Sequence, residues 1–105
     1  MSQPRRGEVW WAETPDEKRR PYVVLTRDSA IPVLQEVLVA PVTRRVRGIP
    51  TEVSLGPDEG LPEPCVAAMD NVQVFLKALL SARAGSLGPE RNHELCRALQ
   101  AAVDC

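Results

Sequence analysis

Three short runs of β-branched and aromatic residues near the N-terminus constrain the fold of this chain more than any other feature. They cover residues 7–11, 20–26 and 39–43, and charged residues or proline follow each run closely. Such side chains are enriched in strands, and runs of about four to eight residues suit strands better than helices. The ten prolines among the 105 residues also oppose long helices. The sequence therefore predicts short strands joined by stiff loops.

The strand pattern continues through most of the chain. We expect a strand wherever an apolar or alternating run lies between turn-forming or charged residues. Residues 14–19 are predicted as a polar loop, a common place for binding residues, and residues 79–87 as a short strand or a turn. The expected strands cover residues 8–12, 22–26, 36–42, 51–55, 65–69 and 72–75.

The last segment, Pro89–Val103, is the clearest helix. Its proline fits the first helical turn, and Glu90 suits the positive end of the helix dipole. About five to seven short strands followed by one helix predict a single, mainly β domain over residues 1–105, folded as a small curved antiparallel sheet or half-open barrel. The apolar residues that recur at helical spacing are Leu95, Leu99, Ala102 and Val103.

The net charge of −1 conceals a basic N-terminal part. Residues 1–47 hold nine Lys or Arg against six Asp or Glu, whereas the remainder holds four against eight. A local basic face attracts an anionic partner even when the whole protein is nearly neutral. The charge pattern is therefore compatible with a polyanion as partner.

Several classes of site lack support in the sequence. The single histidine, His93, lies in the expected helix, and Cys65, Cys96 and Cys105 do not have metal-ligand spacing. We therefore expect no metal and no cofactor, and no phosphate-binding glycine motif is present. Cys65 is expected in the core. Without a signal-like segment or a long apolar run, the chain is expected to be cytoplasmic, with reduced thiols and no membrane partner.

Two residues at the ends of the apolar runs can act on a phosphodiester. The second run opens with Arg20, and the third ends on Thr43, directly before Arg44 and Arg45. Paired strands would hold this guanidinium and this hydroxyl on one edge of the sheet. A guanidinium matches two phosphate oxygens, and a hydroxyl donates one more hydrogen bond to developing negative charge. The pair suits RNA cleavage without a metal, in which the RNA's own 2′-hydroxyl attacks the phosphate.

The same runs carry a resemblance to a known family. The segments Arg6–Trp11, Arg20–Leu25 and Ala40–Thr43, in this order and at this spacing, resemble the MazF/PemK toxins, the toxin halves of bacterial toxin–antitoxin modules. Residues 65–75, with Asp70–Asn71 at their centre, resemble the family's later strand pair. The similarity extends from about residue 5 to the final helix, so it covers almost the whole chain.

This resemblance implies a fold, an activity and partners. The implied fold is an SH3-like barrel that forms a homodimer. The implied activity is that of a metal-independent, sequence-specific endoribonuclease, which cleaves single-stranded RNA to 2′,3′-cyclic phosphate and 5′-hydroxyl ends. Messenger RNA is the expected substrate, with transfer and ribosomal RNA as alternatives. A small cognate antitoxin with an acidic tail is expected to occupy the RNA groove and inhibit the enzyme.

The resemblance also implies roles for individual residues. The family's catalytic arginine falls on Arg20, its catalytic threonine on Thr43, and a polar contact residue on Asn71. Successive residues of a strand point to opposite faces, so one of Trp10 and Trp11 should be in the core, and the other can stack on a base. The residues that we assign to RNA binding are Lys18, Arg19, Trp11, Arg44, Arg45 and Asn71.

Two other functions remain open from the sequence. The first is a gyrase-inhibiting toxin of the same barrel, as in the CcdB branch, but such toxins rely on an apolar, tryptophan-containing C-terminus, and this chain ends in Ala102–Cys105. The second is an SH3-like binding module without catalysis, which would not require Arg20 and Thr43 beside basic loops.

Overall fold

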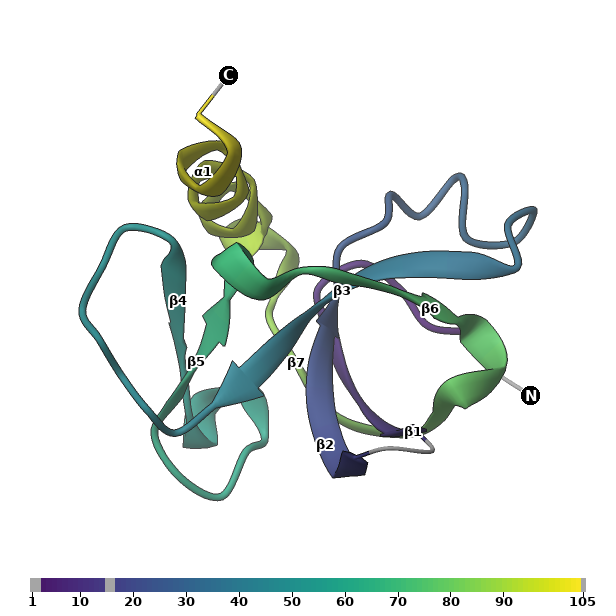
Figure 1. Cartoon of the computed structure of the whole chain (residues 1–105), viewed down its shortest axis with the longest axis horizontal. Coiled ribbons are helices and arrows are strands. Elements are labelled where there is room, and N and C mark those ends of the chain that lie inside the picture. The colour runs from purple at the N-terminus through teal and green to yellow at the C-terminus, as the bar shows by residue number, and fades with distance from the viewer. Residues whose placement is uncertain (1–2, 15–16, 105) are drawn as a thin grey trace.

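The computed structural model describes residues 3–14 and 17–104, which form seven strands, several short 3₁₀ turns and one α-helix (Figure 1). The elements are β1 (Glu8–Thr14), β2 (Glu17–Val24), β3 (Glu36–Thr43), β4 (Glu52–Leu55), β5 (Cys65–Ala68), β6 (Gln73–Leu76), β7 (Leu80–Ser86) and α1 (Asn92–Val103).

The strands form one curled antiparallel sheet. Their order is β4-β5-β3-β2-β1-β7, and β6 pairs with β3 in addition. In Figure 1, β3 crosses the middle of the molecule from β6 to β5. This arrangement, with its single C-terminal helix, confirms the predicted mainly β fold class.

The segment that we predicted as a polar loop at residues 14–19 is mostly strand, so that prediction was wrong. β1 continues to Thr14 and β2 begins at Glu17, with Ala12 opposite Arg20. Lys18, Arg19 and Arg20 are all exposed, so this part of the strand has no alternation of apolar and polar residues by which it could be predicted. Its extended conformation depends on pairing with β1. Residues 15 and 16, which fall in the same predicted loop, lie outside the described residues.

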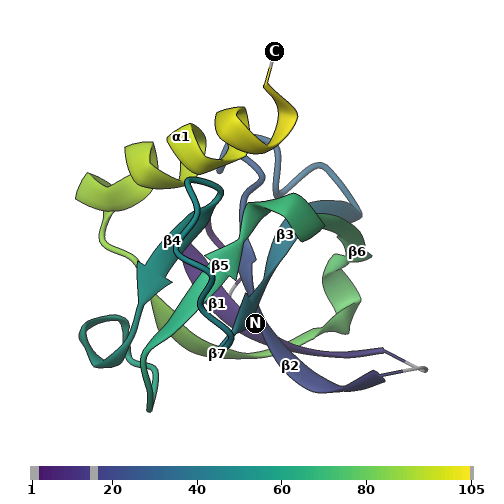
Figure 2. The same cartoon turned by 60° about the vertical axis from the view of Figure 1, so that its left-hand side comes forward.

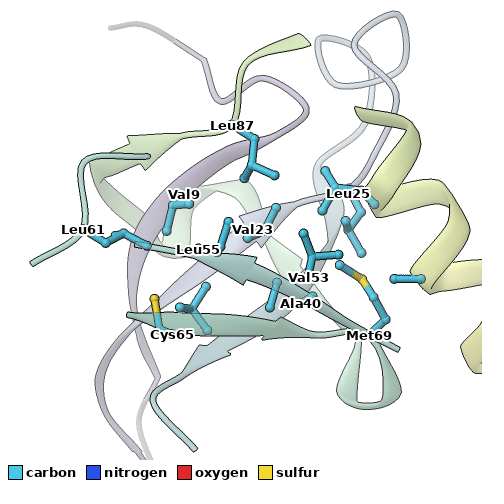
Figure 3. Packing of buried hydrophobic residues seen from close by; sticks show 14 residues of the cluster. Val9, Val23, Leu25, Ala40, Val53, Leu55, Leu61, Cys65, Met69 and Leu87 are labelled. Carbon is cyan, nitrogen blue, oxygen red and sulfur yellow. The ribbon is translucent and has the colours of Figure 1, made fainter. Parts of the chain in front are cut away.

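Successive strand residues alternate between two buried clusters. Val9 and Val23 belong to the first cluster, and their neighbours Trp10 and Val24 belong to the second. Figure 3 shows the first cluster, in which Met69 lies between the strands and the helix. Because a slip of one residue would exchange the two faces of a strand, burial on both faces fixes the strand register. The register in turn fixes the side chains at the strand ends.

Helix α1 lies across the end of β4 and the adjoining 3₁₀ turn η2 (Met69–Asn71), as Figure 2 shows. Leu95 and Ala98 are buried, whereas Val103 is 58% exposed. The predicted apolar stripe was therefore wrong for Val103 and missed Ala98. Val103 lies about 80° around the helix from Leu95, and Ala98 lies about 60° in the opposite sense, toward the sheet. Among the described residues, no helix is both long and apolar enough to cross a bilayer.

Strand β7, in the segment predicted as a strand or a turn, contains a glycine that another loop approaches closely. A Cβ atom at Gly85 would clash with the backbone carbonyl of Glu59. We expect Gly85→Ala to lower the free energy of unfolding by about 1–3 kcal/mol, because no side-chain rotation relieves a clash with backbone. Urea denaturation measures the effect. Gly56→Ala is the matched control, since its Cβ would meet Pro64 at an ordinary 3.7 Å; equal stability of the two variants would contradict the prediction.

Candidate functional site

A cleft opens where β2 and β3 part. These strands pair from Val24 and Val39 as far as Tyr22 and Pro41. Beyond that point β3 continues beside β5, whereas β2 continues beside β1 alone (Figure 1). Residues from both strands line a cleft of about 720 Å³ at this split.

Two prolines mark the point at which the strands separate. Pro21 in β2 and Pro41 in β3 both line the cleft. Proline has no backbone N–H to donate to a ladder, so it is tolerated where pairing stops. The β2–β3 pairing therefore ends here without leaving a backbone N–H group unsatisfied at either proline. Arg20, just before the first proline, and Thr43, two residues after the second, lie on opposite sides of the split.

Six of the eight residues that we predicted for the site line this one cleft. Lys18 and Arg19, both assigned to RNA binding from the sequence, are not among the residues that line it. The six that line the cleft are Trp11, Arg20, Thr43, Arg44, Arg45 and Asn71.

The Arg20 and Thr43 side chains are both available to a ligand. Arg20 is exposed, and its guanidinium makes no hydrogen bond or ion pair with residues 3–14 or 18–104. Thr43 is half-buried, and its Oγ1 accepts a hydrogen bond of 3.1 Å from the backbone N–H of Arg45. That bond occupies a lone pair of the hydroxyl and leaves its proton to donate. The cleft thus presents an exposed cation and a hydroxyl group whose proton can be donated.

Further guanidinium groups lie beyond Thr43, and one of them is paired. Arg44 donates to Glu63 at 2.8 Å across the cleft, and both side chains are exposed. This hydrogen bond and the Glu63 charge raise the pKa of Arg44. Exposed ion pairs of this kind are weak, because water screens them and two long side chains must be ordered. A phosphate can therefore compete with Glu63 for Arg44.

The basic loop at residues 44–50 is ordered by an acidic residue from β4. The Glu52 carboxylate accepts hydrogen bonds from the backbone N–H groups of Arg47, at 3.0 Å, and Gly48, at 2.9 Å. Gly48 itself has a φ of +73°, which favours glycine. Glu52 thus accepts hydrogen bonds from the backbone of Arg47 and Gly48. The Arg47 side chain remains exposed and lines the cleft.

The two tryptophans separate as strand geometry requires. Trp10 is 8% exposed and belongs to the second buried cluster, with its indole N–H donating to Glu8. Trp11 is half-buried and lines the cleft. Arg19 lies against it, with the guanidinium carbon 4.9 Å from the centroid of the Trp11 ring. The prediction that one tryptophan is in the core and the other is accessible is confirmed.

The opposite wall of the cleft contains residues that the sequence analysis did not assign. Ile49 and Leu61 supply apolar surface, and Glu63 and Asp70 supply carboxylates. Asp70 Oδ2 accepts a 2.6 Å hydrogen bond from the hydroxyl of Thr51, which holds the turn that carries Asn71. Arg47 also lines the cleft, and the sequence carries a signal for it, since it follows Arg44 and Arg45 in the same basic loop.

Two further side chains, Cys65 and His93, could in principle act as a nucleophile or a metal ligand, and the structure places them in different environments. Cys65 is buried beside the cleft, and burial, followed by the charges of Glu59 and Glu63, raises the pKa of its thiol. The thiol is therefore protonated near neutral pH, and the prediction of a core cysteine is confirmed. His93 is exposed on α1. Across residues 3–14 and 17–104, no three His, Cys, Asp or Glu side chains are grouped so as to hold a metal ion.

Comparison with protein families and known sequences identifies relatives over almost the whole chain. Residues 5–103 match the family described as PemK-like, MazF-like toxin of type II toxin-antitoxin system. The chain is 46% identical to the probable endoribonuclease MazF5 of Mycobacterium tuberculosis (strain ATCC 25618 / H37Rv), over 97% of this chain and 94% of that protein. It is 38% identical to the probable endoribonuclease MazF2 of the same strain, over 96% and 99% of the two chains.

Solved structures agree with this result. The Mycobacterium tuberculosis toxin MazF-mt6 superposes with a TM-score of 0.84 at 35% identity, covering 92% of this chain and 96% of that one. A structure described as an endoribonuclease in complex with its cognate antitoxin, from a mycobacterial species, also has a TM-score of 0.84, at 25% identity, and covers 96% and 95% of the two chains.

Proposed function

Because the chain belongs to the PemK-like, MazF-like toxin family of type II toxin–antitoxin systems, it is an endoribonuclease toxin, and we propose that it cleaves single-stranded RNA in the cleft between β2 and β3. The observation that carries this proposal is the placement of Arg20 and Thr43 on the two sides of one cleft. We also propose that residues 1–105 act as a single domain and that the protein works in the cytoplasm.

In the proposed reaction, RNA supplies its own nucleophile. The 2′-oxygen forms a bond to phosphorus and loses its proton, while the bond from phosphorus to the 5′-oxygen breaks and that oxygen gains a proton. The products are a 2′,3′-cyclic phosphate and a 5′-hydroxyl. Negative charge builds up on the non-bridging oxygens in the transition state. Two donors aimed at these oxygens lower its energy.

Arg20 and Thr43 are the two donors. The planar Arg20 guanidinium can bind two phosphate oxygens at once. A guanidinium carries only N–H donors and no acceptor, so its principal role is to stabilise charge. The Thr43 hydroxyl, whose oxygen already accepts from the Arg45 N–H, donates its proton to a phosphate oxygen. Arg44, Arg45 and Asn71 then bind the neighbouring nucleotides.

The family relationship supports this reading over the alternatives. Its named relatives are endoribonucleases, not gyrase inhibitors. A binding module without catalysis would not require the Arg20 guanidinium and the Thr43 hydroxyl to line the same cleft.

The direct test is an RNA cleavage assay. The purified protein is incubated with a long single-stranded RNA in EDTA, and the product ends are identified by their reactivity and by sequencing. We expect cleavage at a limited set of sequences, with cyclic phosphate and 5′-hydroxyl ends. A protein that leaves every RNA intact and inhibits gyrase supercoiling would instead be a toxin of the CcdB type.

A cognate antitoxin is the proposed protein partner, and its acidic segment would compete with RNA for the same guanidinium groups. We also propose that the chain forms a homodimer. A two-fold partner would extend the groove along which a single RNA strand lies. Sedimentation equilibrium measures this directly, with a mass of twice 11.6 kDa as the expected result.

RNA binding is expected to weaken steeply as salt rises. Four guanidinium groups line the cleft among the described residues, those of Arg20, Arg44, Arg45 and Arg47. If each binds one phosphate, the logarithm of the association constant falls against the logarithm of salt concentration with a slope of about −3. Arg45→Ala should make the slope shallower by about 0.7. Arg97 is exposed on α1, so the control Arg97→Ala should leave the slope unchanged.

Fluorescence anisotropy with an oligonucleotide that lacks 2′-hydroxyl groups measures this slope, because such a strand cannot be cleaved. A slope near zero would contradict a basic RNA groove.

A further inference from the structure

Arg19 lies outside the cleft but contacts an aromatic side chain that lines it. Its guanidinium carbon is 4.9 Å from the centroid of the Trp11 ring, within the distance of about 6 Å at which a cation is attracted to an aromatic face. Glu13 lies beside the same guanidinium, with an oxygen 4.0 Å from Arg19 Nε. Arg19 is thus held between a carboxylate and an indole on one surface of the β1–β2 hairpin.

Trp11 lines the same cleft as Arg20, the residue proposed to bind the scissile phosphate. Trp11 is opposite Pro21, and Ala12 is opposite Arg20. These successive ladder positions point to opposite faces of the hairpin, yet Trp11 and Arg20 both line the same cleft. A nucleotide whose phosphate is bound by Arg20 would therefore place an adjacent base in the cleft that the Trp11 ring lines.

We propose that Trp11 stacks on the base next to the scissile phosphate, and that Arg19 is a positioning residue that holds the indole in place for it. This inference rests on the proposed RNA cleavage. Aromatic side chains bind bases through their ring faces, largely independently of sequence. Arg19 restricts the indole before RNA arrives, so less conformational freedom is lost on binding. The role assigned to Arg19 from the sequence, direct RNA binding, thereby becomes an indirect one.

The stacking role is tested by removing the base from the RNA and, separately, the aromatic ring from Trp11. Once the cut site is mapped, two RNAs are made with an abasic ribonucleotide on either side of it, each keeping the 2′-hydroxyl. With the wild-type protein, one of the two should have a kcat/KM lower by about 5- to 150-fold, the range that stacking on one aromatic residue supplies. Trp11→Leu should show a similar loss on intact RNA and no further loss on that abasic RNA. Trp11→Phe should keep most of the activity and the abasic penalty.

Arg19 is tested by its dependence on Trp11. Arg19→Ala should lower kcat/KM by about 2- to 5-fold, as expected for an exposed cation on an aromatic ring, and should have no effect in a Trp11→Leu background. Arg19→Lys should restore most of the loss. The control Arg97→Ala removes an exposed charge from α1 and should change nothing. Circular dichroism and thermal unfolding verify that each variant is folded.

The outcomes separate the inference from the proposed function. If folded Trp11→Leu retains the full abasic penalty, the stacking role is refuted while RNA cleavage stands. If Arg19→Ala causes its full loss in the Trp11→Leu background, or makes the salt slope shallower, Arg19 binds phosphate directly and its positioning role is refuted. If the wild-type protein cleaves no RNA, both the function and the inference are refuted.

Discussion

Replacing Arg20 by alanine is expected to slow RNA cleavage by about a hundred- to a thousand-fold, the usual cost of removing a donor that stabilises developing negative charge. The protein should remain folded, because the Arg20 side chain is exposed and makes no hydrogen bond or ion pair with the described residues. Single-turnover cleavage of a mapped RNA substrate measures the loss. Thermal unfolding provides the check on folding.

Two further variants separate geometry from charge at this position. Arg20→Lys keeps the positive charge but loses the planar fork that binds two phosphate oxygens, so it should recover only part of the rate. Arg97→Ala removes an equal charge from the far helix and should cleave normally. Full activity of Arg20→Ala would falsify the assignment of Arg20 and would require another cation of the cleft to hold the scissile phosphate.

Thr43→Val should also reduce the cleavage rate by about a hundred- to a thousand-fold, because it removes the second donor while keeping the shape of the side chain. The same change removes the hydrogen bond that the Arg45 backbone N–H donates to Thr43 Oγ1. This N–H is exposed, so water can accept its hydrogen bond instead. Stability should therefore change little. Thr43→Ser restores the hydroxyl and should recover most of the rate.

These two predictions share one internal control. If Arg20 and Thr43 bind the same transition state, the double variant should lose less than the product of the two single losses, since groups that act together are not additive. Losses that multiply fully would mean that the two residues act in separate steps.

The candidate catalytic residues were predictable because each lies close to a proline. Arg20 directly precedes Pro21, and Thr43 follows Pro41 by two residues. The pairing of β2 with β3 ends at these prolines, and side chains beyond that point are available to ligands. The apolar runs and their family resemblance were therefore enough to predict both the mainly β fold and the pair that faces the cleft.

The opposite wall of the cleft was not predictable from the same signals. Leu61 and Glu63 belong to a turn-rich segment without periodicity, and their position depends on how the β4–β5 pair folds against β3. The Arg19–Trp11 contact was missed for a related reason. It requires the cross-strand register of a hairpin whose charged residues resemble a loop.

The parting of β2 from β3 also has an evolutionary consequence. Arg20 and Thr43 are carried by strands whose alignment is set by the buried clusters, so we expect sequence changes in surface loops to leave this proposed catalytic pair in place. The basic loop at 44–50 and the excursion at 56–64 border the same space yet contribute few strand pairings. We therefore expect changes in these two loops to alter which RNA sequence is bound, without moving Arg20 or Thr43.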